Sequence, residues 1–372
     1  MSGIYLHIPF CKQACHYCDF HFSTSLRYRE RMVSALLREL ELRQDYLSDS
    51  SIETIYFGGG TPSILPPGDI ERILQAIETR FTVAEGAEIT LEANPDDLTD
   101  AKLAELAASP VNRLSIGLQS FDADDLRFFN RAHTATEAET CLQRALHHGF
   151  EDLSVDLIYG SPTTSDAVWH DNLRRVADYG VPHLSCYCLT IEPNTALAKF
   201  VRTGRAQPVN EEQAARQFEY LLEFGAARGY EQYEISNFAR NQRYSRHNSG
   251  YWQGRHYLGI GPSAHSFDGT SRSWNLAHNA RYMRGIEKNE PYRETEQLTA
   301  TERYNEYIMT ALRTKWGVDL RRIRIMGFEE TFLRDSRNPL QRGHLEHDND
   351  IYRLTASGKF LADGIAAQLF AV

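Results

Sequence analysis

Residues 8–20 read IPFCKQACHYCDF and place Cys11, Cys15 and Cys18 within eight positions. Pro9 and the missing apolar period after it predict a loop rather than a helix. A loop of this length can curl so that three sulfurs face one centre. Thiolates are soft ligands that suit iron or zinc. The stretch therefore predicts a metal centre held by three neighbouring thiolates.

The number of thiols indicates what kind of centre this is. A complete iron–sulfur cluster takes four protein ligands, so three would hold a four-iron cluster and leave one iron open for chemistry. The alternative is a structural zinc site with a histidine as fourth ligand, and the candidates are His7, His16 and His21. Zinc sites usually pair two close ligands with two distant ones, which this spacing does not match. We expect the open cluster.

The same stretch carries a family resemblance. C-x3-C-x2-C preceded by Tyr5-x-His7-Ile8-Pro9-Phe10 resembles the radical S-adenosylmethionine (SAM) superfamily. It is most similar to the branch that holds oxygen-independent coproporphyrinogen III oxidase and the HemW haem chaperones. The resemblance implies a [4Fe-4S] cluster whose open iron binds SAM, and an electron donor. One electron from such a cluster cleaves SAM to methionine and a 5′-deoxyadenosyl radical, while the protein positions and shields the chemistry.

The composition limits which partners the protein can have and in which compartment we expect it. The chain has 372 residues and a net charge of −10, which disfavours nucleic acid and anionic membranes as main partners. No apolar run of about 18 residues predicts a membrane span, which leaves room only for transient contact with membrane haemoproteins. Residues 1–5 lack the features of a signal peptide. Six cysteines, three of them clustered, do not suit a secreted disulfide scaffold, so we predict a reducing cytoplasm.

Strands and helices alternate over the first 200 residues or so. The strands are predicted at 4–8, 52–57, 88–93, 113–118, 153–158 and 183–190, and the helices at 28–46, 69–81, 98–107, 123–129, 136–148 and 166–179. Such alternation implies parallel strands with crossover helices, here an α/β, partial TIM-like (β/α)6 barrel over residues 1–235. Cys186 and Cys188 stand two apart on the last strand, so we interpret both as core residues.

The pattern loosens after the barrel. A helix is predicted at 211–228 and a strand at 232–236, but residues 237–289 have few periodic segments. We therefore expect an irregular region at 236–298 that carries a functional motif. A helix at 299–312 then begins a small, mainly helical C-terminal domain at 299–372, which closes with a short strand and a helix.

Residues 58–62, GGGTP, follow the second predicted strand. Three glycines let backbone N–H and C=O groups approach a ligand with no Cβ in the way. An ordinary turn is the alternative, since a triple glycine alone is weak evidence. Its place after the strand that follows the cysteine loop resembles the superfamily's GGGTP segment, which lines the methionyl part of SAM.

Polar residues at or near the ends of later strands complete the predicted site. Carboxylates such as Glu92 and Asp156 suit ribose hydroxyls and the SAM ammonium, and Arg131 suits its carboxylate. Each residue alone could be a solvated or capping group. The resemblance implies that SAM contacts fall on Tyr5, Gly59, Gly60, Thr61, Glu92, Gln119, Arg131 and Asp156, with Tyr17 and Thr190 at less specific positions.

Two features depart from the coproporphyrinogen oxidases. Those enzymes carry a further cysteine two residues after the third, where this chain has Phe20. They also have a longer segment ahead of the cluster than the ten residues found here before Cys11. Both features match the HemW branch and argue against porphyrinogen decarboxylation.

Residues 247–252 read HNSGYW. His247 beside Tyr251 and Trp252 offers an axial ligand and flat apolar surfaces for a porphyrin. The alternative is a buried aromatic cluster with a hydrogen-bonded histidine. HNxxYW resembles the haem-associated signature of the HemW branch, which implies that His247 helps to bind haem. Because the motif lies past the barrel strands, in the region expected to be irregular, we expect haem to lie near the surface. His265, in GIGPSAHS, is a second candidate, or a structural residue.

Together these patterns predict a haem chaperone that carries a [4Fe-4S] cluster and SAM and delivers haem to apo-haemoproteins. The enzymatic alternative is oxidative decarboxylation of coproporphyrinogen III to protoporphyrinogen IX by a 5′-deoxyadenosyl radical. A zinc-stabilised α/β binding protein is the third. Whether the protein is an enzyme stays open at this point.

Overall fold

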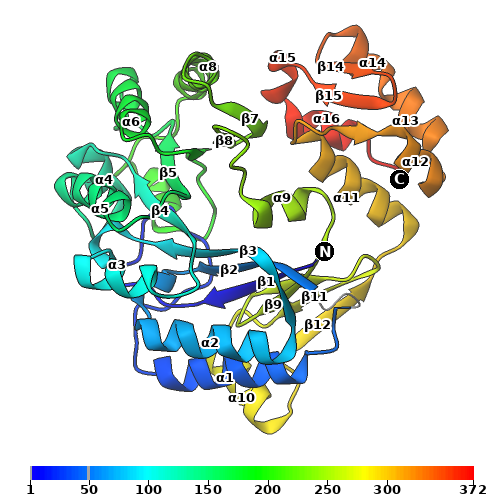
Figure 1. Ribbon diagram of the computed structural model, residues 1–372. Helices are drawn as coiled ribbons and strands as arrows, with labels where there is room; N and C mark the ends of the chain where they lie inside the picture. Colours follow the sequence, from blue (N-terminus) through cyan, green and yellow to red (C-terminus); the bar gives the residue numbers. More distant parts are fainter. Residues whose placement is uncertain (1, 48–50) are drawn as a thin grey trace.

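The computed structural model describes residues 2–47 and 51–372, and it opens with six β/α repeats (Figure 1). The strands are β1 (Ser2–Ile8), β2 (Ser51–Gly59), β3 (Thr82–Ala93), β4 (Arg113–Gln119), β5 (Leu153–Tyr159) and β6 (His183–Cys188). The helices are α1 (Arg29–Leu42), α2 (Pro67–Arg80), α3 (Asp100–Ala107), α4 (Ala123–Phe129), α5 (Ala135–His147) and α6 (Asp166–Asp178). Short 3-10 turns η1 (Pro62–Ile64) and η2 (Pro95–Asp97) follow β2 and β3. The predicted partial barrel is confirmed.

Strands β1 to β6 are parallel neighbours in chain order within one twelve-stranded sheet. Tyr5 pairs with Tyr56, which in turn pairs with Thr90 on β3. Because all six strands run the same way, their carboxyl ends gather at one edge of the sheet. In a TIM-like barrel that edge carries the functional site.

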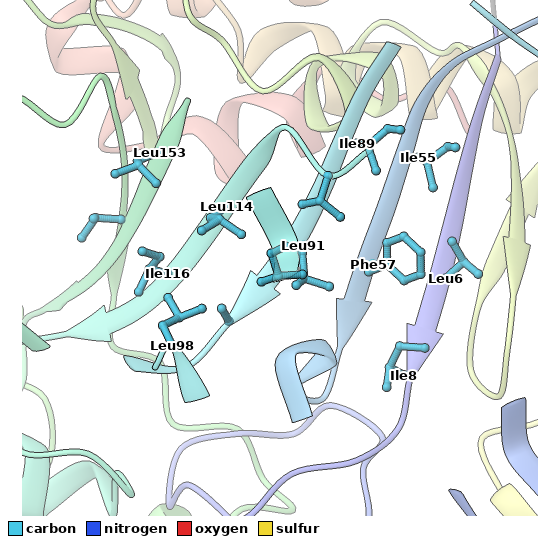
Figure 2. Packing of buried hydrophobic residues seen from close by; sticks show 14 of the residues in the cluster. Leu6, Ile8, Ile55, Phe57, Ile89, Leu91, Leu98, Leu114, Ile116 and Leu153 are labelled. Carbon is cyan, nitrogen blue, oxygen red and sulfur yellow. The ribbon is translucent and has the colours of Figure 1, made fainter. Parts of the chain in front are cut away.

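Side chains alternate along these strands between a helix-covered face and an inner face. Figure 2 shows part of the apolar set packed under the helices, including Leu6, Phe57, Leu91 and Leu114, each of which is fully buried. Burial of one such side chain contributes about 1.5–3 kcal/mol. The alternate positions are often polar and line the inside of the barrel, for example Glu92 on β3. The core thus fixes which residues face inward.

Helix starts follow local capping chemistry. Thr134 caps α5 with a capping box in which Glu137 bonds back to the Thr134 backbone, and Ser165 caps α6 through the Val168 N–H. Such caps satisfy N–H groups that have no partner within the helix. They explain why the predicted starts of these helices lie within a residue of the observed ones.

The stretch expected to be irregular instead extends the sheet at both edges. Its elements, with the three before it, are α7 (Ala196–Arg202), α8 (Glu211–Ala227), β7 (Glu231–Glu234), β8 (Asn237–Ala239), α9 (Arg246–Trp252), β9 (His256–Ile260), β10 (His265–Phe267), β11 (Ser271–Asn275), α10 (Asn279–Lys288) and β12 (Arg293–Gln297). Strand β9 lies parallel to β1, and β8 lies antiparallel to β6. The expectation of an irregular region was wrong because these strands are short and largely polar, so they show no clear period.

Buried polar contacts hold this extension in place. Glu39 of α1 is fully buried and accepts hydrogen bonds from the Gly261 N–H at 2.8 Å, Asn275 Nδ2 at 2.8 Å and the Tyr282 hydroxyl at 2.6 Å. A buried carboxylate needs such donors to offset the loss of water. The partners lie more than 200 positions from Glu39 in the sequence, so no local sequence pattern predicts these hydrogen bonds.

The C-terminal residues form a second core. Its elements are α11 (Ala300–Leu312), β13 (Val318–Asp319), α12 (Leu320–Met326), α13 (Glu329–Asp335), α14 (Arg337–Gln341), β14 (Leu345–Asp348), β15 (Ile351–Leu354), α15 (Ala356–Lys359) and α16 (Ala362–Gln368). Tyr304, Ile308, Phe332 and Leu369 are fully buried within it. A three-stranded sheet accompanies the helices, so the unit is mainly helical, as expected. The exact domain boundaries at 235 and 298 stay a prediction.

No helix among the described residues has both the length and the apolar character needed to cross a membrane.

Candidate metal and cofactor centre

The cysteine loop leaves β1 and is pinned at both ends. The Cys11 N–H donates to the Ser23 carbonyl at 3.1 Å, and the Ser23 N–H donates to the Pro9 carbonyl at 2.9 Å. Its middle is tied to the barrel because the His16 N–H donates to the Phe129 carbonyl at 3.0 Å. Residues 11–20 contain no helix or strand, which confirms the loop prediction.

All three loop cysteines are unoxidised and half-buried. Thr61 Oγ1 donates to Cys11 Sγ at 3.5 Å, and Arg131 Nη1 donates to Cys15 Sγ at 3.5 Å. Burial raises the pKa of Cys18 to about 12 and also raises that of Cys11. These two thiols therefore stay protonated until a cation binds, and metal binding would release their protons.

The geometry disfavours the zinc alternative. Within residues 2–47 and 51–372, no three Cys, His, Asp or Glu side chains converge as they would on a single ion. His7 Nε2 bonds to the His21 carbonyl at 2.8 Å, His16 Nδ1 to the Phe128 carbonyl at 2.9 Å and His21 Nε2 to Asn279 Oδ1 at 2.7 Å. Each candidate fourth ligand is thus engaged elsewhere. A four-iron cluster does not require its cysteine sulfurs to converge on a single ion, because each cysteine binds a separate iron.

A cavity of about 1080 Å³ lies at the carboxyl edge of the strands, next to this loop. Nearly every residue that the sequence nominates lines it: Cys11, Cys15, Tyr17, Cys18, Gly59, Gly60, Thr61, Glu92, Gln119, Arg131, Asp156 and Thr190. The structure brings these side chains together from seven segments of the chain. Tyr5 and His247 are not among the lining residues.

The glycine segment packs directly against the cysteine loop. The Gly60 N–H donates to the Ile8 carbonyl at 2.9 Å, and the Thr61 N–H donates to the Phe10 carbonyl at 2.7 Å. A Cβ on Gly60 would lie 2.6 Å from the Phe10 carbonyl oxygen. Gly59 has φ of +104°, a conformation that side chains rarely adopt. Glycine is therefore required here for loop contact as well as for an open ligand face.

Two carboxyls in the cavity have raised pKa values. Burial raises the pKa of Glu92 to about 7, although Tyr56 donates to Glu92 Oε1 at 2.7 Å and the Gly59 N–H donates to Oε2 at 3.2 Å. Burial likewise raises the pKa of Asp156 to about 6. A cationic ligand would stabilise both carboxylates, so the pair suits a positively charged partner.

Arg131 lines the cavity and has one N–H donor without a hydrogen-bond partner among the described residues. Its Nη2 donates to Asn94 Oδ1 and to the Gly117 carbonyl, both at 2.6 Å. Its buried Nε finds no partner in the described part of the chain. Asn94 also donates to Thr61 Oγ1 at 3.3 Å and so links two walls. Asn94 is not among the site residues predicted from the sequence, although its place directly after β3 was the available signal.

Gln119 ends β4 with φ of +66°. A positive φ is uncommon for a residue other than glycine and is strained in most settings. The turn bends the strand end into the cavity and supports the placement of Gln119 in the site.

His247 is buried, with 3% of its surface exposed, inside an aromatic cluster. Nδ1 bonds to Thr54 Oγ1 at 2.8 Å, Nε2 bonds to the Tyr251 hydroxyl at 2.8 Å, and the ring stacks on Tyr56 with centroids 5.0 Å apart. Burial lowers its pKa to about 3. This is the hydrogen-bonded aromatic cluster that the sequence left as the alternative. His247 itself does not reach the surface, because α9 packs beside β2, and the position of haem near the surface stays a prediction.

Tyr5 also lies outside the main cavity. Its hydroxyl bonds to His7 Nδ1 at 3.2 Å, and its ring borders a second cavity on the other side of the cysteine loop. The contact with SAM implied for Tyr5 is therefore not supported by this geometry.

The interpretation of Cys188 as a core residue needs correction. Cys186 is buried, whereas Cys188 is exposed and lines the main cavity. Both residues share one face of β6, but the strand ends at Cys188, where the cavity begins.

The C-terminal domain supplies one wall of the same cavity, through Arg313 and residues 359–364. No motif in the sequence indicated this role. This wall belongs to the separate C-terminal core, and only the docking of that core against the barrel brings it to the site.

Comparisons with known proteins agree with this geometry. The profile of the "Radical SAM superfamily" matches residues 5–176, and that of the "HemN C-terminal domain" matches residues 298–361. The "Heme chaperone HemW" of Mycobacterium tuberculosis is 34% identical over 99% of this chain and 94% of its own length. The chain belongs to the HemW family. The "Heme chaperone HemW" of Bacillus subtilis is 32% identical, with 98% of each chain covered.

The fold is shared more widely. The solved structure described as "Coproporphyrinogen III oxidase (HemN) from Escherichia coli is a Radical SAM enzyme" superposes with a TM-score of 0.85 at 22% identity. The match covers all of this chain and 90% of that one. The resemblance inferred from the cysteine spacing, to the HemN-like branch near HemW, is confirmed.

Membership in a radical SAM family implies a [4Fe-4S] cluster and SAM, and the cavity residues fit both. Three thiols on one loop suit a cluster with an open iron. The unpartnered Arg131 Nε is a donor for a carboxylate, and Glu92 and Asp156, whose pKa values burial raises, are acceptors for a cation. An amino acid end group carries both charges.

Proposed function

We propose that this protein is a haem chaperone that carries a [4Fe-4S] cluster and SAM and passes haem to apo-haemoproteins. The observation that carries the proposal is full-length similarity to proteins named "Heme chaperone HemW", together with the cavity in which the predicted cluster and SAM residues meet. Similarity at both ends of the chain matters, because the C-terminal domain closes the cavity.

The residue roles follow from the chemistry of each group. Cys11, Cys15 and Cys18 hold the cluster. The backbone of Gly59 and Gly60, with Thr61, borders the methionyl end of SAM beside the open iron. Arg131 binds the carboxylate, and Glu92 the ammonium. The remaining contacts are Tyr17, Gln119, Asp156 and Thr190, which line the same cavity.

When bound and reduced, the cluster supplies one electron to SAM. The chain's own residues prepare the site for it: the paired loops fix the thiols, Arg131 and Glu92 orient the charged end, and the C-terminal wall excludes water. Recipient haemoproteins and an electron donor are the remaining partners. All six cysteines are free thiols, as a reducing compartment such as the predicted cytoplasm would keep them.

Two parallel assays on anaerobically reconstituted protein test the proposal. One follows haem binding by absorbance and its transfer to excess apomyoglobin. The other supplies coproporphyrinogen III, SAM and a reductant and looks for protoporphyrinogen IX. We expect haem binding and transfer without decarboxylation. Absence of haem binding would refute the chaperone function, and robust turnover would favour the enzyme.

A further inference from the structure

A second cavity, of about 620 Å³, lies between strands β9–β11 and the helices α11 and α12 of the C-terminal domain. This volume falls in the usual range of about 300–1,000 Å³ for cofactor pockets. Asp19 and Phe20 line both this cavity and the main one, so the segment directly after Cys18 separates the two. A ligand here would lie beside the cluster loop.

The cavity has a wall of flat apolar rings. Tyr251 meets Tyr257 edge to face with centroids 4.6 Å apart, and Trp252 and Phe267 continue the surface. Phe20, whose side chain is 68% exposed, faces the same space. The buried Nε1 of Trp252 has no hydrogen-bond partner among the described residues. Such walls suit a large planar ligand that also carries polar groups.

One imidazole in this cavity is available to a metal. His265 is exposed, and none of the hydrogen bonds in the described part of the chain involves its ring. His7 and His21, which also line the cavity, are both hydrogen-bonded. Burial and the nearby Arg272 lower the pKa of His265, which keeps the ring neutral with a lone pair for iron.

The rim carries cations that lack counter-ions. Arg303 and Arg322 line the cavity, and neither forms an ion pair with any residue whose placement is described. The Arg322 guanidinium lies over the Tyr307 ring, 4.1 Å from its centroid. Unpaired arginines on a protein with a net charge of −10 indicate an anionic ligand.

We propose that haem docks in this second cavity, with His265 as the iron ligand and with Arg303 and Arg322 facing the propionates. This assignment rests on the proposed chaperone function. His247 is then a positioning residue: its bond to the Tyr251 hydroxyl holds that ring in the wall. The HNSGYW motif builds the surface for the macrocycle, while the ligand comes from the neighbouring GIGPSAHS segment.

The space near each histidine supports this division of roles. The pocket that His247 borders has a volume of only about 20 Å³, far below that of a porphyrin. The cavity of His265 is large enough, and the His265 side chain is exposed on β10, where a recipient protein could reach the haem.

Haem titrations of three single variants test the ligand. His265→Ala should weaken binding by at least about tenfold, since losing even a supporting partner of a metal ligand costs roughly 10- to 100-fold. It should also shift the Soret band. His247→Ala should weaken binding but leave the Soret position unchanged. His147→Ala, which removes an exposed imidazole from α5 far from both cavities, is the matched control and should behave as wild type.

Haem dimethyl ester tests the arginines. The wild type should bind the ester less tightly than haem, and the double variant Arg303→Gln/Arg322→Gln should lose that preference. Arg342→Gln, an exposed arginine outside this cavity, is the control and should keep it. Circular dichroism establishes that each variant is folded, and His265→Gln replaces the alanine variant if that one unfolds.

The outcomes separate the two proposals. A wild-type protein that binds no haem refutes the chaperone function itself. A wild type that binds haem, with a Soret shift in the His247 variant and none in the His265 variant, overturns the assignment to the second cavity and leaves the chaperone function standing.

Discussion

Gly60 is the point at which the glycine segment and the cysteine loop touch most closely, so Gly60→Ala tests that contact. A Cβ there would lie 2.6 Å from the Phe10 carbonyl oxygen, 2.8 Å from the Ile8 carbonyl oxygen and 2.8 Å from the Phe10 nitrogen. All three are backbone atoms and cannot swing aside as a side chain does. The two segments must separate.

The cost of separation can be estimated from the bonds that hold them together. Moving apart breaks the Gly60 N–H bond to Ile8 and the Thr61 N–H bond to Phe10. At about 1 kcal/mol each, their loss gives about 2 kcal/mol. Overpacking in general costs about 1–3 kcal/mol, so we expect Gly60→Ala to lower the free energy of unfolding by about 2–3 kcal/mol.

Gly68→Ala is the matched control, because Gly68 stands in the first turn of α2 with no atom within 4 Å of its Cβ position. It should stabilise by about 0.4–1 kcal/mol. Because the entropy of unfolding is about 2.1 cal/mol/K per residue, thermal unfolding should show Tm lowered by roughly 3–4 °C for Gly60→Ala and slightly raised for Gly68→Ala. Iron bound after reconstitution should fall only in the first variant, because Thr61 would move away from Cys11. Equal Tm and equal iron in both variants would refute the reasoning.

Three further predictions concern the cluster, SAM and catalysis. Alanine at any one of Cys11, Cys15 or Cys18 should reduce bound iron and sulfide. The control is Cys188→Ala, which removes an exposed thiol of the same cavity and should leave both unchanged. Full iron content in any of the three loop variants would count against these cysteines as the cluster ligands. Because the pKa of Glu92 is about 7, SAM affinity measured by calorimetry should be full near pH 8 and fall as pH drops through 7, and Glu92→Gln should abolish that dependence. A flat wild-type profile would exclude Glu92 as the ammonium partner. Coproporphyrinogen III should not be decarboxylated at a useful rate with SAM and an electron donor under anaerobic conditions, because Phe20 replaces the additional cysteine. Formation of protoporphyrinogen IX would favour the oxidase over the haem chaperone.

The sequence by itself determined the barrel and most of the main cavity. Parallel strands with crossover helices can be read from alternation along the chain, and their carboxyl ends must meet at one edge. Gly60 follows β2, and Glu92 and Asp156 lie in the second halves of the predicted strands 88–93 and 153–158, so the fold class already favoured their convergence with the cysteine loop. The family resemblance then gave these positions their chemistry.

Only the tertiary structure decided where the haem-associated motif lies. HNSGYW fixes a short helix, but the burial of His247 depends on Thr54 of β2, almost 200 positions earlier. The pairing of β9 with β1 joins residues 256–260 to residues 2–6, and the C-terminal domain then closes both cavities. Local periodicity carries no information about such contacts, because their free energy comes from groups that meet only after the chain has folded. The same physical reason explains why the sequence named His265 only as a second candidate, although its imidazole is left without a hydrogen bond to any described residue in the second cavity.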